Sequence, residues 1–347
     1  MNEAGKPGDS VTVALPGRTL AELITSYQTH KVSSFHKLRY HNRKWQAALL
    51  TRISGLYGHF QLKDIRYVTA KEWHMDWLGP ENKIAIAHAM VGALRTLAGF
   101  GLTLLEDEEC ERLSLVLRKL KLPQYEPRTS VMTAEQAIAI RGYARGQMRY
   151  SIALAQALQF ELILRQKDIL GEFIPVSEPG VSDVVVTKKR SGKTIAEKWM
   201  RGLRWEEIDQ NMILRHVTSK KSKVLEIDLK MAPMVIEELG TMDRSLFPAS
   251  GPIIISESTG LPYHADDFRR KWRLIADMAG VPEDVQNRDS RAGGISEARD
   301  AGADIENVRE AATHADVSQT RDYDRNKQKK ISDVQAKRLE YRTKKVG

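Results

Sequence analysis

The segment His314-Ala-Asp-Val-Ser-Gln-Thr-Arg-Asp-Tyr323 lies near the end of a chain of 347 residues and places one imidazole nine residues before one phenol. Taken singly, such a histidine is most often a surface or hydrogen-bonded core residue. Such a tyrosine is most often a partly buried packing residue. A chemical role for either residue therefore depends on which other side chains the chain supplies.

Four basic residues precede this segment in the second half of the chain. They are Arg165, which closes an expected helix, Lys220, in an expected hairpin turn, and Arg288 and Arg291, which open another expected helix. Phosphodiester transfer without a metal needs a nucleophile, cations that hold the non-bridging oxygens, and an acid that protonates the leaving oxygen. Several basic side chains and one hydroxyl must converge for that reaction, and this ordered set contains them.

Charge and composition fit a protein that acts on a polyanion. The net charge is +9, the isoelectric point is about 9.4, and 41% of the residues are hydrophobic. These values indicate a globular chain whose partner is most simply nucleic acid. No apolar run approaches the roughly 20 residues of a membrane-spanning helix, so no membrane partner is expected. The N-terminal residues lack the pattern of a secretory signal.

Cys110 is the only cysteine. One thiol forms neither an internal disulfide nor a cysteine-based zinc site, which predicts a reducing cytoplasm and a buried structural role for Cys110.

Hydrophobic spacing predicts two domains and an α+β fold that is mostly α. Three- and four-residue spacing indicates helices over 18–120, and two prolines interrupt the pattern in 121–130. Thr133-Ala-Glu-Gln136 has the form of a capping box and begins a stretch, 134–170, expected to hold two helices. Short β-rich runs at 184–186, 212–217 and 224–229 predict a small antiparallel sheet, with Ser219-Lys-Lys-Ser222 as a hairpin turn. The expected parts are a flexible N-terminus 1–17, a helical domain 18–123, a linker 124–130, a catalytic domain 131–325 and a basic tail or helix 326–347.

The ordered set resembles the catalytic domain of the tyrosine recombinases, the phage integrase family. That family's pattern runs Arg, a hairpin Lys, His-x-x-Arg, His or Trp, and then Tyr. The segment 314–323 is similar to its closing motif, including a Thr three residues before the Tyr, and Leu-Arg-Trp-Glu-Glu-Ile-Asp at 203–209 resembles part of its sheet. The resemblance covers about 130–330, whereas 18–120 matches the family's core-binding domain only in length, helicity and basicity.

The resemblance implies a role for each residue of the set. Arg165 and Arg291 would clamp the scissile phosphate, His314 would add a hydrogen bond, and Tyr323 would form a 3′-phosphotyrosine. Lys220 would be the general acid, with Lys221 and Lys223 of the same turn as alternatives. Arg288 stands where the family usually has histidine, and it cannot act as a base near neutral pH. The reaction would need no cofactor, ATP or metal.

The resemblance also implies partners and a cellular setting. These are double-stranded DNA with a specific recombination site, a homo-tetramer on two duplexes, an accessory directionality factor and a cytoplasmic, nucleoid-associated location. Integration or excision of a mobile element is the expected role; a type IB topoisomerase and a DNA-binding regulator that has lost catalysis are the alternatives. DNA contacts, or merely solvated faces, are expected at Lys37, Arg39, Arg43, Lys44, Arg269, Arg270, Lys271 and Arg273.

Three further motifs have simpler interpretations. Ser191-Gly-Lys-Thr194 lacks the first glycine of a phosphate-binding loop, so an exposed β-hairpin turn is expected. His264 with Asp266 and Asp267 predicts helix capping rather than a metal site. Ile331, Val334 and Leu339 form a modest apolar stripe, with which the family resemblance implies docking on a neighbouring protomer.

Overall fold

The computed structural model of the chain describes residues 18–123, 128–190, 192–220, 222–241, 248–323 and 327–346. Its contacts divide the chain into two compact units, Met1–Glu126 and Pro127–Gly347. The predicted N-terminal segment 1–17 and part of the predicted linker 124–130 lie outside the described residues.

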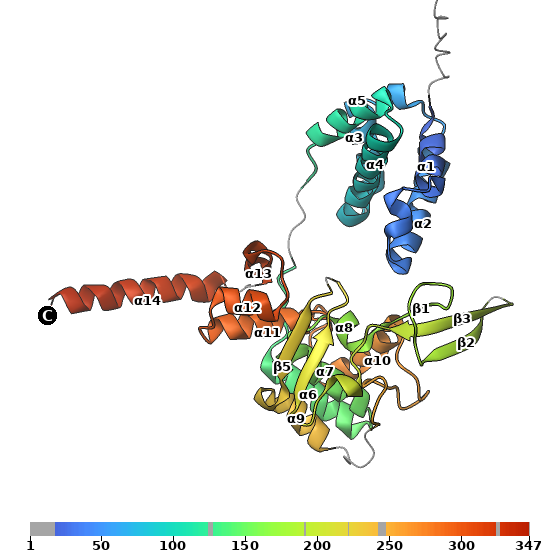
Figure 1. The fold of residues 1–347 in the computed structure, drawn as a ribbon. Helices are drawn as coiled ribbons and strands as arrows, with labels where there is room; N and C mark the ends of the chain where they lie inside the picture. The colour runs from blue at the N-terminus through green and yellow to red at the C-terminus, as the bar shows by residue number, and fades with distance from the viewer. Residues whose placement is uncertain are drawn as a thin grey trace, which may run out of the picture. The chain divides into compact units, whose positions relative to one another are not determined.

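The first unit is helical throughout its described residues (Figure 1). Its α-helices are α1 (Leu20–Thr29), α2 (Tyr40–Tyr57), α3 (Tyr67–Leu78), α4 (Ile84–Leu104) and α5 (Glu108–Lys119), with 3-10 turns at Ser34–Lys37 and Leu62–Asp64. A capping box between Thr19 and Glu22 begins α1. Because α4 packs against the other four helices, it forms the centre of this unit.

The apolar helix α4 corrects one prediction. Its 21 residues are long and apolar enough to cross a membrane by length and composition, although no such stretch was expected. Its buried side chains, among them Met90, Leu94 and Leu97, belong to the core of the first unit. α4 therefore has the character of a central core helix.

Cys110 lies in the same core, as predicted. A Cβ built on Gly101 of α4 would lie 2.2 Å from its Sγ, so α5 and α4 approach closely at this point. Burial raises the pKa of the Cys110 thiol to about 12.

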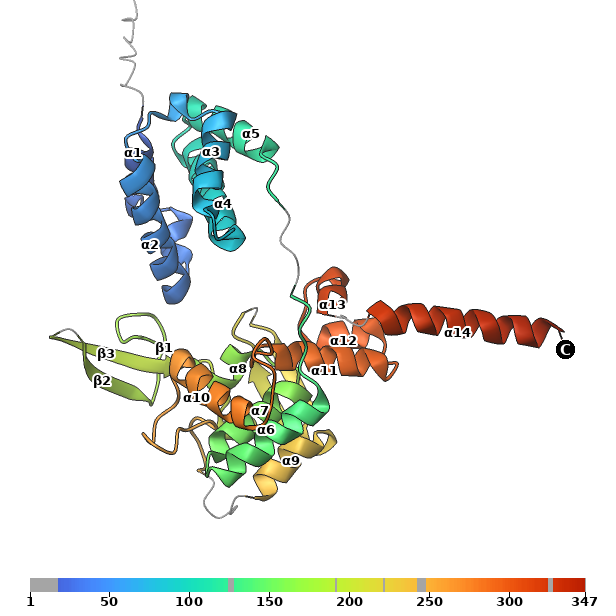
Figure 2. The same ribbon diagram turned by 180° about the vertical axis from the view of Figure 1, so that it is seen from behind.

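The second unit combines helices with two small antiparallel sheets, which confirms the predicted mostly-α fold class (Figure 2). Its helices are α6 (Ala134–Gly146), α7 (Tyr150–Glu161), α8 (Gln166–Leu170), α9 (Pro233–Gly240), α10 (Ala265–Met278), α11 (Asp289–Asp300), α12 (Ile305–Ala311), α13 (Val317–Tyr323) and α14 (Lys327–Val346). The capping box at Thr133 begins α6 as predicted. The stretch 134–170 holds three helices rather than two, because the short α8 follows α7.

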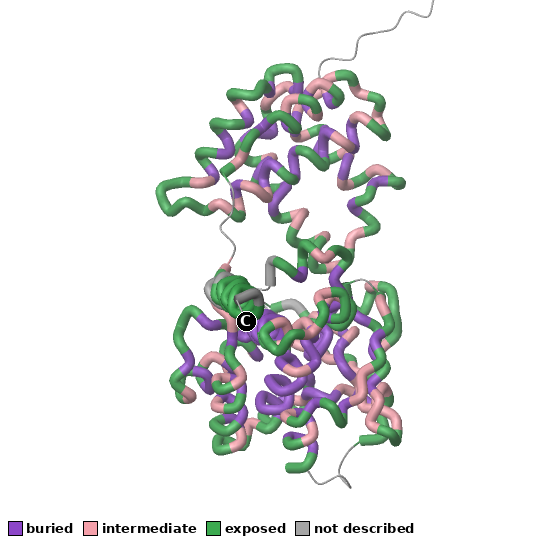
Figure 3. The backbone as a smooth tube through the Cα atoms, turned by 90° about the vertical axis from the view of Figure 1, so that its left-hand side faces the viewer, coloured by how far each residue is buried: buried purple, intermediate pink, exposed green. Residues whose placement is uncertain are grey.

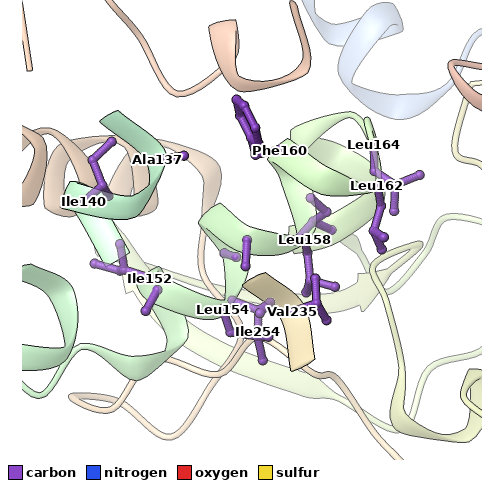
Figure 4. Packing of buried hydrophobic residues seen from close by; sticks show 14 of the residues in the cluster. Ala137, Ile140, Ile152, Leu154, Leu158, Phe160, Leu162, Leu164, Val235 and Ile254 are labelled. Atoms are coloured by element: carbon purple, nitrogen blue, oxygen red, sulfur yellow. The ribbon is translucent and has the colours of Figure 1, made fainter. Parts of the chain in front are cut away.

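Helix α7 forms the centre of the second unit. Its residues from Ser151 to Phe160 are all buried, and its apolar side chains pack among those of α6 and α9 (Figure 4). In the burial-coloured trace, buried backbone runs through the middle of this unit and exposed backbone lies outside it (Figure 3). A helix buried on every side needs apolar residues all round, and α7 has them over most of its length.

The two sheets differ in how well the sequence predicted them. The strands β4 (Ile213–Val217) and β5 (Val224–Asp228) form the predicted antiparallel hairpin around 219–222. The second sheet has the order β1-β3-β2, with β1 (Glu172–Pro175), β2 (Val185–Arg190) and β3 (Lys193–Met200). No strand was predicted at β1. The turn at 191–194 implied a strand after it, but no β-rich run marked β3, because β3 contains Lys, Ala and Glu, which are depleted in strands. The predicted turn at 191–194 is the end of the β2 and β3 hairpin.

The start of α10 also differs from expectation. α10 begins at Ala265 with His264 at its N-cap, and no side chain caps it, so the predicted capping by Asp266 or Asp267 is wrong. The helix α14 shows Val334, Leu339 and Tyr341 more than half exposed; the side chain of Ile331 lies outside the described residues.

Candidate active site

Arg165 stands at the N-cap of α8, and its side chain reaches a distant segment. Arg165 therefore opens α8, whereas the sequence placed it at the close of a helix. Its Nη1 donates a hydrogen bond of 2.9 Å to Oγ1 of Thr313, the residue before His314. Two members of the predicted set are thereby held next to each other, although 148 positions separate the bonded residues.

Arg291 on α11 connects the same two segments from within the protein. Its side chain is buried, Nη1 donates to the carbonyl of Ile163 at 2.6 Å, and Nη2 donates to the carbonyl of Ala312. The two residues that accept from Arg291 therefore precede Arg165 and His314 by two positions each. A buried cation that binds two backbone carbonyls fixes both segments, because leaving either group unpaired would cost free energy.

Two glycines allow α11 to come this close. A Cβ on Gly293 would lie 2.0 Å from the carbonyl oxygen of Met132, and one on Gly294 would lie 2.3 Å from that of Phe160. Side chains at these positions would push α11 away from the end of α7. The glycines therefore set the depth at which Arg291 enters the site.

The backbone is strained at both segments that Arg291 holds. Ile163 has φ of 54° and Thr313 has φ of 53°. Left-handed backbone is costly for β-branched residues, and such strain concentrates at functional sites, where surrounding contacts maintain it. The carbonyl of Ile163 and the hydroxyl of Thr313 are the groups that accept from Arg291 and Arg165.

His314 is buried and is oriented by the helix that follows it. Its Nδ1 lies 3.0 Å from Oγ1 of Thr320 on α13, a hydroxyl that is itself fully buried. If the Thr320 hydroxyl donates, Nε2 carries the imidazole proton. This contact gives a physical reason for the threonine within the segment 314–323.

Tyr323 is the last residue of α13, and its side chain lies outside the described residues. Position 323 follows Thr320 by three residues. Positions three apart lie on one face of an α-helix, so position 323 shares the face from which Thr320 contacts His314.

The turn that carries Lys220 is held beside Arg165 by Asp168 of α8. The carboxylate of Asp168 is fully buried, accepts a hydrogen bond of 2.6 Å from the backbone N–H of Ser219, and has its other oxygen 3.9 Å from Nη1 of Arg165. The turn that carries Lys220 is therefore anchored beside Arg165. Lys220 itself is exposed.

The other two lysines of the turn are distinguished by the structure. Lys223 forms an ion pair with Glu310 of α12. Lys221 lies outside the described residues. Of the two described lysines, Lys220 is the one that no carboxylate pairs among the described residues.

Arg288 is exposed at the N-cap of α11. The next residue, Asp289, is buried and forms a bidentate ion pair with Arg128. The Arg128 nitrogens lie 2.7 to 3.1 Å from the Asp289 carboxylate oxygens. This pair fastens the segment before α6 to the start of α11. Arg288 thus extends outward from a fixed helix end.

The predicted DNA contacts fall into two groups that lie in different units. At the start of α2, Lys37, Arg39 and Lys44 are exposed, whereas Arg43 donates to the carbonyl of Leu38 at 2.9 Å. Exposed Trp45 follows them. Such a group of cations beside an aromatic ring has the composition of a nucleic-acid surface.

On α10 the predicted cations are paired with acids of the same helix. Arg269 pairs with Asp266, and Arg270 and Lys271 pair with Asp267. Arg273 pairs with Asp277 and also donates to carbonyls of the loop before α11, so the structure gives it a local packing role. Arg269 and Arg270 remain more than half exposed.

Sequence reasoning missed Thr313, Ile163 and Ser219, which hold the arginines and the lysine turn in place. Their contacts join positions far apart in the chain or depend on unusual φ values, and neither leaves a local sequence signal. Asp168 contacts both Arg165 and the backbone N–H of Ser219, and Ser219 is 51 positions away in the chain.

Comparison with known proteins identifies the fold. No protein-family model matches the chain, and no curated protein matches it in sequence. Solved structures match over nearly the whole chain. A lambda integrase dimer bound to a COC′ core site has a TM-score of 0.65 and 14% identity, covering 90% of this chain and 79% of that one.

Two further structures agree with this match. A lambda integrase tetramer bound to a Holliday junction has a TM-score of 0.63 and 15% identity, covering 90% and 79% of the two chains. The Tn1549 transposon integrase in complex with circular intermediate DNA has a TM-score of 0.62 and 13% identity, covering 88% and 95%. These integrases are tyrosine recombinases. The chain therefore has the tyrosine recombinase fold.

Proposed function

We propose that this protein is a site-specific DNA recombinase that cleaves and rejoins DNA through a phosphotyrosine intermediate at Tyr323. One observation carries the proposal, namely that hydrogen bonds gather four of the expected groups. Arg165 donates to Thr313, and Arg291 donates to the carbonyls of Ile163 and Ala312. His314 contacts Thr320, and the turn of Lys220 donates to Asp168 through the backbone N–H of Ser219.

In the proposed reaction the Tyr323 hydroxyl oxygen attacks phosphorus, and the bond from phosphorus to the 5′-oxygen breaks. The phenol proton passes to water, because Arg288 offers no base. Lys220 gives its proton to the departing 5′-oxygen. The guanidinium groups of Arg165 and Arg291 and Nε2–H of His314 stabilise the negative charge on the phosphoryl oxygens.

The covalent bond to Tyr323 conserves the energy of the phosphodiester. Attack by the 5′-hydroxyl of another strand reverses the first step and exchanges strands, so no ATP, metal or cofactor takes part. Two duplexes and four protomers would assemble for exchange, as the lambda integrase tetramer bound to a Holliday junction suggests by analogy.

We infer that the biological role is integration or excision of a mobile element, in the cytoplasm and on nucleoid DNA. The fold match to a transposon integrase supports this role by analogy. An accessory directionality factor fits the same proposal. The exposed cations at the start of α2 and on α10 are proposed to bind DNA phosphates.

A deletion assay tests the proposed function. A plasmid carries, in direct orientation, the two border repeats of the DNA segment that encodes this chain, and the purified protein should excise the DNA between them. Tyr323→Phe should abolish excision, and Tyr341→Phe, which alters an exposed tyrosine of α14, should leave it intact.

The same assay separates the alternatives. Relaxation of a supercoiled plasmid that lacks the repeats would indicate a type IB topoisomerase. Binding to the repeats without any cleavage by the wild-type protein would indicate a regulator that has lost catalysis.

A further inference from the structure

We propose that the hairpin of β2 and β3, named here the basic ribbon (185–200), binds duplex DNA to one side of the cleavage site. This inference rests on the proposed function, because a recombinase acts on the DNA that the ribbon would bind. It assigns a role to the turn at 191–194, which the proposed reaction does not use.

The composition of the basic ribbon fits a polyanion. Between Asp183 and Glu197 the sequence has no acidic residue, and it has four cations, Lys188, Lys189, Arg190 and Lys193. The cations gather at the end of the hairpin, where Arg190 pairs with Lys193. A run of cations without an acidic residue is the composition that a phosphate backbone binds.

The two faces of the basic ribbon differ. Val185, Thr187 and Lys189 alternate along β2 and are exposed, and Thr194 opposite Lys189 is exposed as well. On the other face Lys188 pairs with Glu197 at 2.5 Å and lies 3.4 Å from Nε2 of His264. Lys188 is therefore occupied in holding the ribbon near α10, and Lys189 presents its charge to solvent.

The base of the basic ribbon is rigidly mounted next to α8. The indole of Trp199 donates to the carbonyl of Leu170 at 2.8 Å, and a Cβ on Gly171 or Gly202 would lie 2.5 or 2.3 Å from its ring atoms. The buried ammonium of Lys198 donates to the carbonyls of Val176, Glu178 and Gly180. A ribbon fixed in this way can bind without a large loss of conformational entropy.

The mounting determines where the ribbon would meet DNA. β3 runs from Lys193 at the end of the hairpin to Met200, which pairs with Glu172 just after α8. Seven steps of about 3.4 Å give a reach of about 24 Å from the base. Figures 1 and 2 both show β2 and β3 extending beyond α10. Arg165 caps α8, next to the base of the ribbon. A ribbon of this length that runs along the duplex would span about 7 base pairs from that base.

The geometry of a two-stranded ribbon also fits duplex DNA. The major groove admits a two-stranded β-ribbon, and threonine side chains are small enough to approach base edges. The exposed face carries Thr187 and Thr194 beside Lys189. Phosphate contacts by the cations would fix the ribbon, and the threonines would face the bases.

Binding to trimmed duplexes tests the inference in the full-length protein. One duplex extends about 15 base pairs beyond the cleavage site and the other about 4, so that only the longer one reaches the end of the ribbon. Wild-type protein should bind the longer duplex about 10-fold more tightly. Lys189→Glu should bind both alike, and its slope of log affinity against log salt should fall by about one or more.

Lys230→Glu is the matched control. Lys230 is 59% exposed, belongs to the same unit and pairs with Asp228, so the variant makes the same charge change away from the ribbon. It should keep the preference for the longer duplex. Equal thermal unfolding of both variants would show that each is folded.

The outcomes separate the inference from the proposed function. If Lys189→Glu retains the full preference for the longer duplex, the ribbon does not bind DNA and the inference is wrong. If the variant loses that preference while the wild-type protein never cleaves, the ribbon binds DNA and the proposed function is wrong.

Discussion

Arg165 and Thr313 are joined by a hydrogen bond of 2.9 Å, and Thr313 adopts a left-handed backbone conformation immediately before His314. The strained conformation directs the Thr313 hydroxyl to the guanidinium, and it leaves His314 at the start of the segment that ends in Tyr323. In the proposed site this bond orients one cation relative to the other groups that act on the phosphate.

Thr313→Val should slow DNA cleavage by about 10-fold, because it keeps the shape and removes the bond, whose loss costs about 1 kcal/mol or more. Thr313→Ser should stay close to wild type, since the hydroxyl remains. The measurement is the single-turnover rate of cleavage of a nicked suicide substrate. Equal rates for the valine and serine variants would show that the bond does not orient Arg165.

Lys220→Ala should slow cleavage of ordinary DNA by about 100-fold or more, the range for loss of a general acid. The defect should largely disappear on DNA whose leaving 5′-oxygen is replaced by sulfur, because a thiolate leaves without being protonated. Lys223→Ala, which breaks only the ion pair with Glu310, serves as the comparison. Rescue of Lys223→Ala rather than Lys220→Ala by the sulfur substrate would assign the acid to Lys223.

Gly294→Ala should destabilise the second unit by about 1–3 kcal/mol, because its Cβ would meet the carbonyl of Phe160 at 2.3 Å. Gly142→Ala offers a control within α6, where a Cβ would meet nothing within 4 Å. That control should be neutral or more stable by up to about 1 kcal/mol. Chemical denaturation of the three proteins gives the comparison, and equal stability of the two alanine variants would contradict the close approach of α11.

His74 should make the stability of the first unit depend on pH. Burial lowers the pKa of His74, and the neighbouring His88 lowers it further. The unfolded chain therefore binds a proton more readily than the folded unit, so this contribution is complete above about pH 6.5 and is lost as pH falls below it. His74→Phe should reduce the drop in Tm between pH 8 and pH 5.5. An unchanged drop would show that His74 does not titrate on unfolding.

The sequence predicted those parts of the fold that have local signals. The capping box at Thr133 and the turn between β4 and β5 depend on neighbouring residues, and both are present. β3 was missed because its residues gain strand structure only from pairing with β1 and β2. The apolar length of α4 was missed because His88 and Arg95 interrupt the run of apolar residues, although the helix as a whole is long and apolar enough to cross a membrane.

The sequence likewise predicted only part of the candidate site. The ordered set of Arg165, Lys220, Arg291 and His314 could be recognised in the sequence because each residue type has a chemical use. The contacts that hold these side chains could not be predicted from the sequence. Ser219 contributes a backbone N–H and Ile163 a backbone carbonyl, and nearly every residue has both groups. Only the folded chain shows which of these backbone groups meet a charged side chain.

Mass mapping of the protein–DNA adduct tests the central claim most directly. Wild-type protein is trapped on a suicide substrate and digested, and the peptide that carries the nucleotide is sequenced. The account predicts a 3′-phosphoryl link to Tyr323, with a free 5′-hydroxyl on the other DNA fragment. An adduct on another residue, or an equal yield of adduct from Tyr323→Phe, would contradict it.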